Sequence, residues 1–308
     1  MTTAFVLSGG GSLGAVQAGM LLALADRHVV PDLLVGSSVG ALNAAYVAGH
    51  PGHRGVEDLA AIWTKLRRSD IFPTDLRRIA RALTGHSNGI ADPRPLRRLV
   101  ETQLPYQRIE HAPWPLAVVA TEVTTGREVV LTEGPSVDAI MASAALPGVF
   151  PPVEVDGHLL MDGGVVNNSP ISVARSLGAT RIYVLPTGYA CALENPPRSP
   201  LGMAMHAVTV AIQRRLVQDV QDMQAQPGSA GLDRVDLRVA PPLCPVSVSP
   251  VDFRAAARLI ERAREATRAW LDRPVAADQS AHLALHRHGP EPAATTERSL
   301  DAPASQCA

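Results

Sequence analysis

The sequence has little of several features that would point directly to a class of protein. Cysteine occurs only at Cys191, Cys244 and Cys307, and this odd, widely spaced set suggests neither a disulfide framework nor a zinc site, so we expect a reducing compartment. A net charge of -1 argues against a dedicated nucleic-acid partner. The chain also lacks an apolar run of the roughly 20 residues that span a bilayer. No basic segment precedes the first apolar residues, as it would in a signal peptide, so we expect a cytoplasmic protein.

Apolar segments with the pattern of buried strands alternate with segments of helical spacing. With 308 residues, 46% of them hydrophobic, the chain is long enough to bury a full core. Repeated strand-helix units predict an α/β fold whose mostly parallel sheet is covered on both faces. The last helix is expected at residues 251–271, and strands are expected at residues 4–7, 33–35, 116–121, 127–131, 181–185 and 235–239.

A nucleophile motif follows the second expected strand. Gly36-Ser37-Ser38-Val39-Gly40 fits the pattern G-x-S-x-G between an apolar run and a helical run, which is the setting of a nucleophile elbow. The tight turn forces Ser38 into a strained conformation, and glycine at positions 36 and 40 avoids clashes with the neighbouring strand and helix. The Ser38 hydroxyl then projects at the positive end of the helix, which favours the negative charge that develops during acyl transfer.

A glycine loop follows the first expected strand and admits two interpretations. Gly9, Gly11 and Gly14 fit the dinucleotide fingerprint G-x-G-x-x-G. That fingerprint also needs an acidic residue at the end of the second strand, where this chain has the nucleophile motif instead. We therefore favour an oxyanion hole over a nucleotide-binding module, with the N–H groups of Gly10 and Gly11 held beside Ser38 by adjacent parallel strands.

A carboxylate on a tight turn occurs further along, at Asp162-Gly163-Gly164. Asp-Gly turns are common, so in isolation this motif predicts only a turn. A Ser-His-Asp esterase is a further alternative, for which His158 and His206 are the downstream candidates in the folded region. Neither histidine lies in a recognisable motif.

Two segments differ in composition from the rest of the chain. Residues 56–103 are helical in pattern and rich in arginine, and they predict either solvated helix faces or a cap that docks on anionic lipid. Helices are expected there from Thr74 and from Pro93, the second one capped by Asp92. Residues 273–308 are rich in Ala, Pro, Ser, Thr, Glu and His, and they predict a disordered tail.

Four motifs occur in order: Ser8-Gly9-Gly10-Gly11-Ser12-Leu13-Gly14, Gly36-Ser37-Ser38-Val39-Gly40, Ser143-Ala144-Ala145-Leu146-Pro147-Gly148 and Asp162-Gly163-Gly164. Together they resemble the patatin-like phospholipase family. The resemblance implies a three-layer α/β/α fold and a Ser-Asp dyad with no catalytic histidine. It makes Ser38 the nucleophile, Asp162 the base and the Gly9-Gly10-Gly11 loop the oxyanion hole. Many family members carry a basic residue where this chain has Leu13, and the backbone donors do not depend on it.

The resemblance also implies how the chain is divided. It gives a catalytic core at residues 4–175 with a helical cap insertion around residues 55–103. The strand-helix pattern continues the same domain over residues 176–272, and the change in composition sets off the tail at 273–308. The resemblance implies a lipid or acyl-ester substrate, activity of the phospholipase A or lysophospholipase type, and no cofactor. No carboxylate or histidine cluster has the spacing of metal ligands, so no metal is expected. Contact with a membrane would be peripheral.

Overall fold

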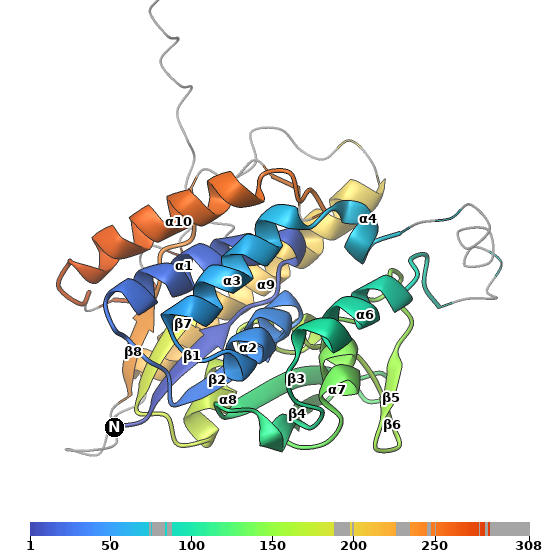
Figure 1. Ribbon diagram of the computed structural model, residues 1–308, viewed down its shortest axis with the longest axis horizontal. Helices are drawn as coiled ribbons and strands as arrows, with labels where there is room; N and C mark the ends of the chain where they lie inside the picture. Colours follow the sequence, from blue (N-terminus) through green and yellow to red (C-terminus); the bar gives the residue numbers. More distant parts are fainter. Residues whose placement is uncertain are drawn as a thin grey trace, which may run out of the picture.

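Short apolar segments form the strands of a sheet that lies at the centre of the molecule (Figure 1). The computed structural model describes residues 1–73, 75, 84, 88–187, 198, 200–225, 235–244, 248–249, 251–276, 278–280 and 283. The strands are β1 (Thr3–Leu7), β2 (Leu33–Ser37), β3 (Leu116–Glu122), β4 (Glu128–Leu131), β5 (Val153–Val155), β6 (His158–Asp162), β7 (Arg181–Leu185) and β8 (Asp236–Val239). Their order is β5-β6-β3-β2-β1-β7-β8, and β4 pairs with β3 off this path.

Parallel pairing dominates the middle of the sheet. β1 pairs in parallel with β2 and β7, β2 pairs with β3, and β7 pairs with β8. β3 pairs antiparallel with β4 and β6, and β6 pairs antiparallel with β5. The predicted α/β fold with a mostly parallel sheet is therefore confirmed. The sequence did not predict β5 or the antiparallel course of β6, because these short strands are partly exposed and lack a long apolar run.

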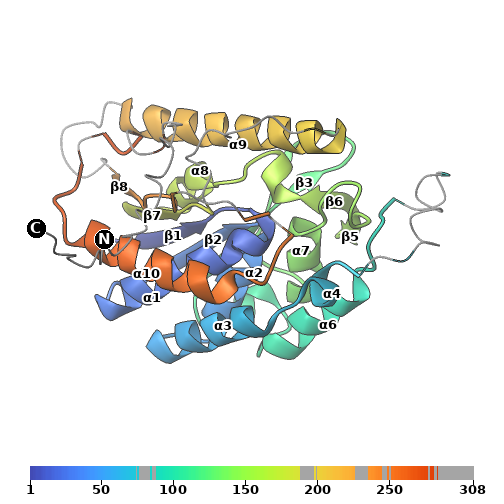
Figure 2. The ribbon, with the colours of Figure 1, turned by 90° about the horizontal axis from the view of Figure 1, so that it is seen from above.

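Helices cover both faces of the sheet. In Figure 2, α8 (Ile171–Ser176) and α9 (Pro200–Ala225) lie on one face, and α1 (Gly14–Asp26), α2 (Val39–Gly49) and α10 (Ala256–Leu271) lie on the other. The arrangement is a three-layer α/β/α fold. No helix in the described part of the chain has both the length and the hydropathy to cross a bilayer. The remaining helical elements are α3 (His53–Lys65), α4 (Arg68–Ile71), α6 (Arg94–Gln103), α7 (Ser136–Ser143) and the 3-10 turns η1 (Gly11–Leu13), η2 (Ile109–His111) and η3 (Gly163–Val165).

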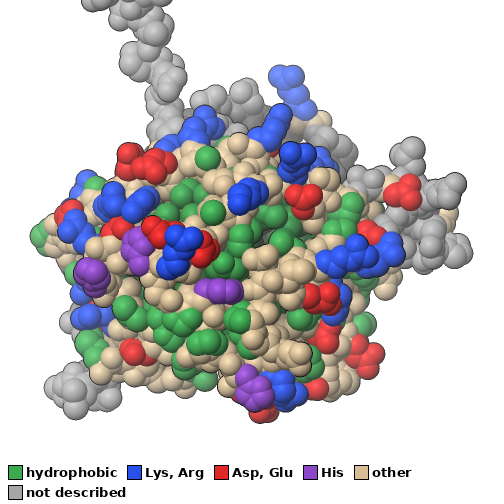
Figure 3. Space-filling view, viewed as in Figure 1, with side chains coloured by type: hydrophobic (Ala, Val, Ile, Leu, Met, Phe, Trp, Pro, Cys, Tyr) green, Lys and Arg blue, Asp and Glu red, His purple; other side chains and the backbone are tan. Residues whose placement is uncertain are grey.

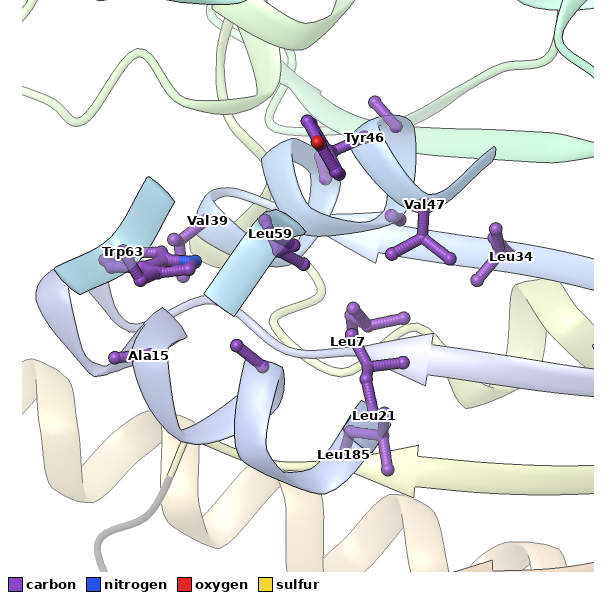
Figure 4. Packing of buried hydrophobic residues seen from close by; sticks show 14 of the residues in the cluster. Leu7, Ala15, Leu21, Leu34, Val39, Tyr46, Val47, Leu59, Trp63 and Leu185 are labelled. Carbon is purple, nitrogen blue, oxygen red and sulfur yellow. The ribbon is translucent and has the colours of Figure 1, made fainter. Parts of the chain in front are cut away.

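The alternation of side chains along the strands gives each face of the sheet its own core. Leu7 and Leu34 belong to one cluster with buried residues of α1, α2 and α3, some of which Figure 4 shows. Val6 and Val35, one residue away, belong to the opposite cluster, which α8 and α9 cover. Strands that are buried on both faces read as continuous apolar runs, which is why the sequence predicted them.

The arginine-rich segment begins as part of the helical layer. α3 buries Leu59 and Trp63 and packs against α1 and α2. α6 begins at Arg94 with Pro93 as its N-cap residue, so the expected start at Pro93 with Asp92 as the cap is one residue too early. Asp92 still contacts this end of the helix, because its Oδ1 accepts a hydrogen bond from the Arg94 N–H at 3.1 Å. The helix expected from Thr74 lies outside the described residues. The role of this segment as a cap stays a prediction.

The first part of the expected tail is built into the folded body. Leu283 is buried within the cluster under α9, and its carbonyl accepts a hydrogen bond from Gln213 Nε2 at 2.6 Å. Gln279 Oε1 accepts a hydrogen bond from the Val239 N–H at 2.9 Å, so it satisfies a donor at the end of β8. The polar composition of this segment did not predict these contacts. They involve a few side chains with specific partners, and such contacts leave no pattern in the sequence. The rest of the expected tail lies outside the described residues.

The crossing of α2 over the end of β1 predicts a severe effect of Gly40→Ala. A Cβ at Gly40 would lie 2.0 Å from the Leu7 carbonyl oxygen, and main-chain atoms of a central strand cannot move aside. We expect a loss of about 3 kcal/mol or more in the free energy of unfolding, measured in urea. Gly126→Ala is the matched control, because its Cβ would meet nothing within 4 Å. The positive φ of 70° at Gly126 predicts a cost of only about 1–2 kcal/mol, and equal losses in the two variants would contradict the argument.

Candidate active site

Neighbouring strands bring residues that are far apart in sequence to one edge of the sheet. β1 ends at Leu7, which lies beside Gly36 of β2 in the parallel register. Two residues beyond this pair on each strand lie Gly9 and Ser38, and they are close together, because a Cβ at Gly9 would lie 3.0 Å from the Cβ of Ser38. The carboxyl ends of parallel strands are the usual position of a site in an α/β fold, because the following loops converge there.

Ser38 sits on the sharp turn between β2 and α2. Its φ of 54° and ψ of -126° are unfavourable for a residue with a side chain, as expected for a nucleophile elbow. The hydroxyl of Ser143 holds this turn, since it accepts a hydrogen bond from the Ser38 N–H at 2.9 Å and donates to the Val119 carbonyl at 2.6 Å. Ser38 is also the N-cap residue of α2, so its side chain lies at the positive end of that helix.

Asp162 is the partner of the Ser38 hydroxyl. Ser38 Oγ donates to Asp162 Oδ2 at 2.6 Å, and the Gly164 N–H donates to Asp162 Oδ1 at 2.7 Å. The antiparallel course of β6 explains this contact, because β6 ends at Asp162 beside Ala120, near the level at which β2 ends. The main chain of Asp162 is fixed as well, since its N–H donates to the Ala145 carbonyl at 3.0 Å and its carbonyl accepts from Thr121 Oγ1 at 2.8 Å.

The Asp162 carboxyl is almost completely withdrawn from water, with 3% of the residue exposed. Burial raises its pKa from 3.8 to about 6, although the hydrogen bonds from Ser38 and Gly164 act in the opposite direction. A carboxylate with a higher pKa is a stronger base toward a hydroxyl group. The surroundings of Asp162 therefore favour proton transfer from Ser38.

The glycine loop presents two N–H groups toward the site. Neither the Gly10 N–H nor the Gly11 N–H has a hydrogen-bond partner among the residues that the structure describes, and both glycines line the same cavity as Ser38. The Gly9 N–H differs, because it donates to the Asn168 carbonyl at 3.1 Å. The N–H groups of Gly10 and Gly11 are therefore the ones available to a ligand, and the role of the Gly9-Gly10-Gly11 loop as an oxyanion hole stays a prediction.

The other glycines of the motifs surround this centre. Gly36 and Gly40 flank Ser38, Gly14 begins α1 beneath the loop, and Gly163 and Gly164 continue from Asp162. The two candidate histidines are not the partners of the Ser38 hydroxyl, because Ser38 Oγ donates to Asp162. His158 Nδ1 is paired with Glu122 Oε1 at 2.8 Å, and His206 lies on α9. In the described ranges, no three His, Cys, Asp or Glu side chains form a group that could hold a metal ion.

An apolar cavity of about 280 Å³ opens from Ser38 and Asp162. Part of it lies between α2, α3 and α6 and is lined by Tyr46, Leu59 and Leu99 among others, while another part reaches α9. Figure 4 shows Tyr46 and Leu59 on neighbouring helices, and Figure 3 shows hydrophobic side chains gathered around a hollow on the face that carries α3 and α6. Among the described residues that line the cavity, Asp162 is the only Asp, Glu, Lys or Arg. Such a lining suits a hydrocarbon chain next to a small polar centre.

Comparison with known proteins identifies the family of the chain. A family model described as patatin-like phospholipase matches residues 5–175, which include the glycine loop, Ser38 and Asp162. The chain belongs to the patatin-like phospholipase family. The resemblance that the sequence motifs indicated is thereby confirmed.

Named relatives of this patatin-like chain are much longer proteins. Patatin-like phospholipase domain-containing protein 7 of Rattus norvegicus is 32% identical over 191 residues, which are 60% of this chain and 13% of that protein. Neuropathy target esterase sws of Drosophila melanogaster is 30% identical over 185 residues, which are 59% of this chain and 13% of that protein. The match therefore spans only a small part of the length of these relatives.

Solved structures resemble this patatin-like chain more distantly. VipD from Legionella pneumophila gives a TM-score of 0.44 at 15% identity, covering 88% of this chain and 66% of that one. Human GIVD cytosolic phospholipase A2 gives a TM-score of 0.40 at 10% identity, covering 92% of this chain and 60% of that one.

Three residues that hold this patatin-like site were given no role by the sequence analysis. Ser143 supports the elbow, and Asn168 and Thr187 contact the glycine loop at Gly9. Ser143 lies within the third motif, but the motif alone does not indicate that its hydroxyl contacts the Ser38 N–H. Thr187 lies two residues beyond the expected strand at 181–185, and only the register with β1 reveals what it touches.

The raised pKa of Asp162 predicts that Asp162→Asn stabilises the protein at neutral and alkaline pH. Asp162 binds its proton more tightly in the folded state than in the unfolded state, so stability falls as the pH rises from about 4 through about 6. A change in pKa from 3.8 to about 6 corresponds to ~3 kcal/mol. The asparagine variant does not titrate at this position. Its advantage in free energy of unfolding should therefore be present at pH 8 and disappear near pH 4, which urea unfolding at both pH values measures.

Asp26→Asn is a matched control of opposite sign. Hydrogen bonds from Arg264, His53 and Arg268 hold the pKa of Asp26 below its usual range. That substitution should therefore lower stability at pH 8, and the loss should shrink as the pH falls below about 4. A difference between wild type and Asp162→Asn that does not change with pH would contradict the raised pKa of Asp162.

Proposed function

We propose that this protein is a serine acyl-ester hydrolase that acts on lipids through a Ser38-Asp162 dyad. The observation that carries the proposal is the 2.6 Å hydrogen bond from Ser38 Oγ to the buried carboxyl of Asp162, at the end of an apolar cavity. Membership of the patatin-like phospholipase family supports the same class of reaction. The named relatives include a neuropathy target esterase, which also supports ester hydrolysis.

Acylation begins when Ser38 Oγ attacks the ester carbonyl carbon. Asp162 Oδ2 accepts the Ser38 proton as the new C–O bond forms. The carbonyl oxygen becomes an oxyanion that faces the N–H groups of Gly10 and Gly11, and removal of such a donor typically costs about 10²–10³ in turnover. When the tetrahedral intermediate collapses, the ester C–O bond breaks and the leaving alcohol takes the proton from Asp162.

Deacylation repeats these steps with water in place of the hydroxyl group of Ser38. Asp162 accepts a proton from the attacking water, and the oxyanion again faces the glycine loop. Collapse releases the fatty acid and returns the proton to Ser38 Oγ. Both half-reactions need Asp162 to be ionised at the start, so its pKa of about 6 sets the acid limb of the pH profile.

The lining of the cavity supports an acyl chain as the group that is bound. The part between α2, α3 and α6 offers aliphatic and aromatic side chains such as Leu42, Tyr46 and Val100. Burying each CH₂ of an acyl chain there contributes about 0.8 kcal/mol. A phospholipid or lysophospholipid presents such a chain on an ester carbonyl, and this is the substrate class that we propose.

We infer that the protein meets its substrate at a lipid surface. Val165, Val208 and Val251 come from three different segments, line the cavity and are 54%, 53% and 39% exposed. Apolar side chains around an entrance are favourable when the entrance faces lipid rather than water. The contact would be peripheral, and a cytoplasmic location stays a prediction.

Hydrolysis of p-nitrophenyl esters of increasing chain length tests the dyad. Wild type should hydrolyse the longer chains with a higher kcat/KM, and kcat/KM should fall as the pH drops below about 6. Ser38→Ala and Asp162→Asn should each lower turnover by at least about 10³-fold while the protein stays folded.

His158→Gln combined with His206→Gln is the control, and this double variant should keep its activity because Ser38 is paired with Asp162. A folded and active Asp162→Asn variant would refute the dyad. Loss of activity in the histidine double variant would instead favour a Ser-His-Asp mechanism.

Binding to anionic phospholipid vesicles tests the lipid-surface proposal. Val208→Asp combined with Val251→Asp places charge at the apolar entrance and should reduce co-sedimentation with vesicles about tenfold or more. Val30→Asp is the matched control, because Val30 is 57% exposed and is not among the residues that line the cavity. Equal vesicle binding by the two variants would show that this entrance does not face the lipid.

A further inference from the structure

We propose that Thr187 is a positioning residue that fixes the direction of the Gly10 N–H, one of the two oxyanion donors of the function proposed above. Thr187 follows β7, outside residues 5–175 that the family model matches. Its hydroxyl donates to the Gly9 carbonyl at 2.6 Å, and the residue is 4% exposed. It touches neither Ser38 nor Asp162 through a hydrogen bond, so its effect on the reaction passes through the glycine loop.

The register of the sheet explains why Thr187 reaches the loop. Leu7 of β1 pairs with Leu185 of β7, and two residues further along both chains Gly9 lies beside Thr187. On the other edge of β1, the same Gly9 lies beside Ser38. The loop therefore runs between the nucleophile on one side and Thr187 on the other.

The geometry of the peptide group turns this contact into control of the donor. The Gly9 carbonyl and the Gly10 N–H belong to one planar peptide group, and in the trans form they point in opposite directions. Holding the carbonyl toward Thr187 therefore holds the N–H toward the other side. That other side is the side of the Gly9 Cα, where an added Cβ would lie 2.4 Å from Asn168 Oδ1 and 3.0 Å from the Cβ of Ser38.

Steric contact between Thr187 and Gly10 also restricts the position of the glycine loop. A Cβ at Gly10 would lie 2.2 Å from Thr187 Oγ1 and 2.6 Å from Thr187 Cβ, so the main chain of Gly10 is pressed against this side chain. Asn168 Nδ2 also donates to the Gly9 carbonyl, at 3.4 Å. Thr187 supplies the shorter of these two hydrogen bonds. Donation to the carbonyl also polarises the peptide group, which strengthens its N–H as a donor.

Thr187→Val removes the hydroxyl and keeps a branched side chain of similar shape. We expect kcat for a soluble p-nitrophenyl ester to fall about 10- to 100-fold with KM changed less than about threefold, because the donor is still present but less well directed. The rate at which a fluorophosphonate labels Ser38, with fluoride as the leaving group, should fall by a similar factor. The acid limb of the pH profile should not move, since Asp162 is unchanged.

Thr187→Ser restores the hydroxyl and should recover most of kcat. Thr180→Val is the matched control at the other end of β7, where Thr180 Oγ1 accepts a hydrogen bond from the Thr2 N–H at 3.0 Å far from the site, and it should leave kcat unchanged. If Thr187→Val does not fold, Thr187→Ala removes the same hydroxyl with less crowding.

Three results would overturn the proposal. One is an active wild type whose kcat differs from that of Thr187→Val by less than threefold. The others are an effect of Thr187→Val on KM alone, and a Thr187→Ser variant whose kcat does not recover. A wild type that neither hydrolyses esters nor is labelled by the fluorophosphonate would instead refute the proposed function itself. The two failures are therefore distinguishable.

Discussion

The hydrogen bond between Ser38 and Asp162 joins residues that are 124 positions apart in the chain, and the surrounding structure serves to keep it dry and short. Burial of the Asp162 carboxyl disfavours its charged form, and the Ser38 hydroxyl and the Gly164 N–H compensate for part of that cost. The same lack of water that destabilises the carboxylate makes it a better base. Burial of the Asp162 carboxylate therefore lowers the stability of the fold and raises the basicity of the same group.

The sheet supplies the frame that holds this pair. Ser38 follows the end of β2, Asp162 ends β6, and the intervening strand β3 fixes the spacing between them. The glycine loop follows β1 and faces β2 on one side and β7 on the other. The helices α2, α3 and α6 then enclose the apolar cavity that begins at this edge. Ser38, Asp162 and the glycine loop thus follow or end different strands, and the order of the strands decides that they meet.

The sequence predicted the parts of the structure that depend on local pattern. The strand at 181–185 has the expected bounds because a buried parallel strand is a continuous apolar run. The helix expected from residue 251 begins instead at Ala256, where Phe253 ahead of it stacks on Trp63 in a contact that no local pattern shows. Ser38 stood out because Gly36 and Gly40 flank it, whereas Asp162 acquired a role only from the resemblance of four motifs in order. Thr187 did not stand out, because a threonine after a strand is unremarkable until the register of two strands places it beside Gly9.

The long separations within the site also govern when it is assembled. Thr187 and Gly9 are 178 positions apart, and Asp162 follows Ser38 by 124. During synthesis Ser38 leaves the ribosome well before Asp162, and contacts between distant residues form late in folding. A chain that has paired only β1 with β2 carries the serine without the carboxylate. The proposed dyad is thus assembled only when β6 has joined the sheet beside β3, so a chain that lacks this pairing would have no base next to Ser38.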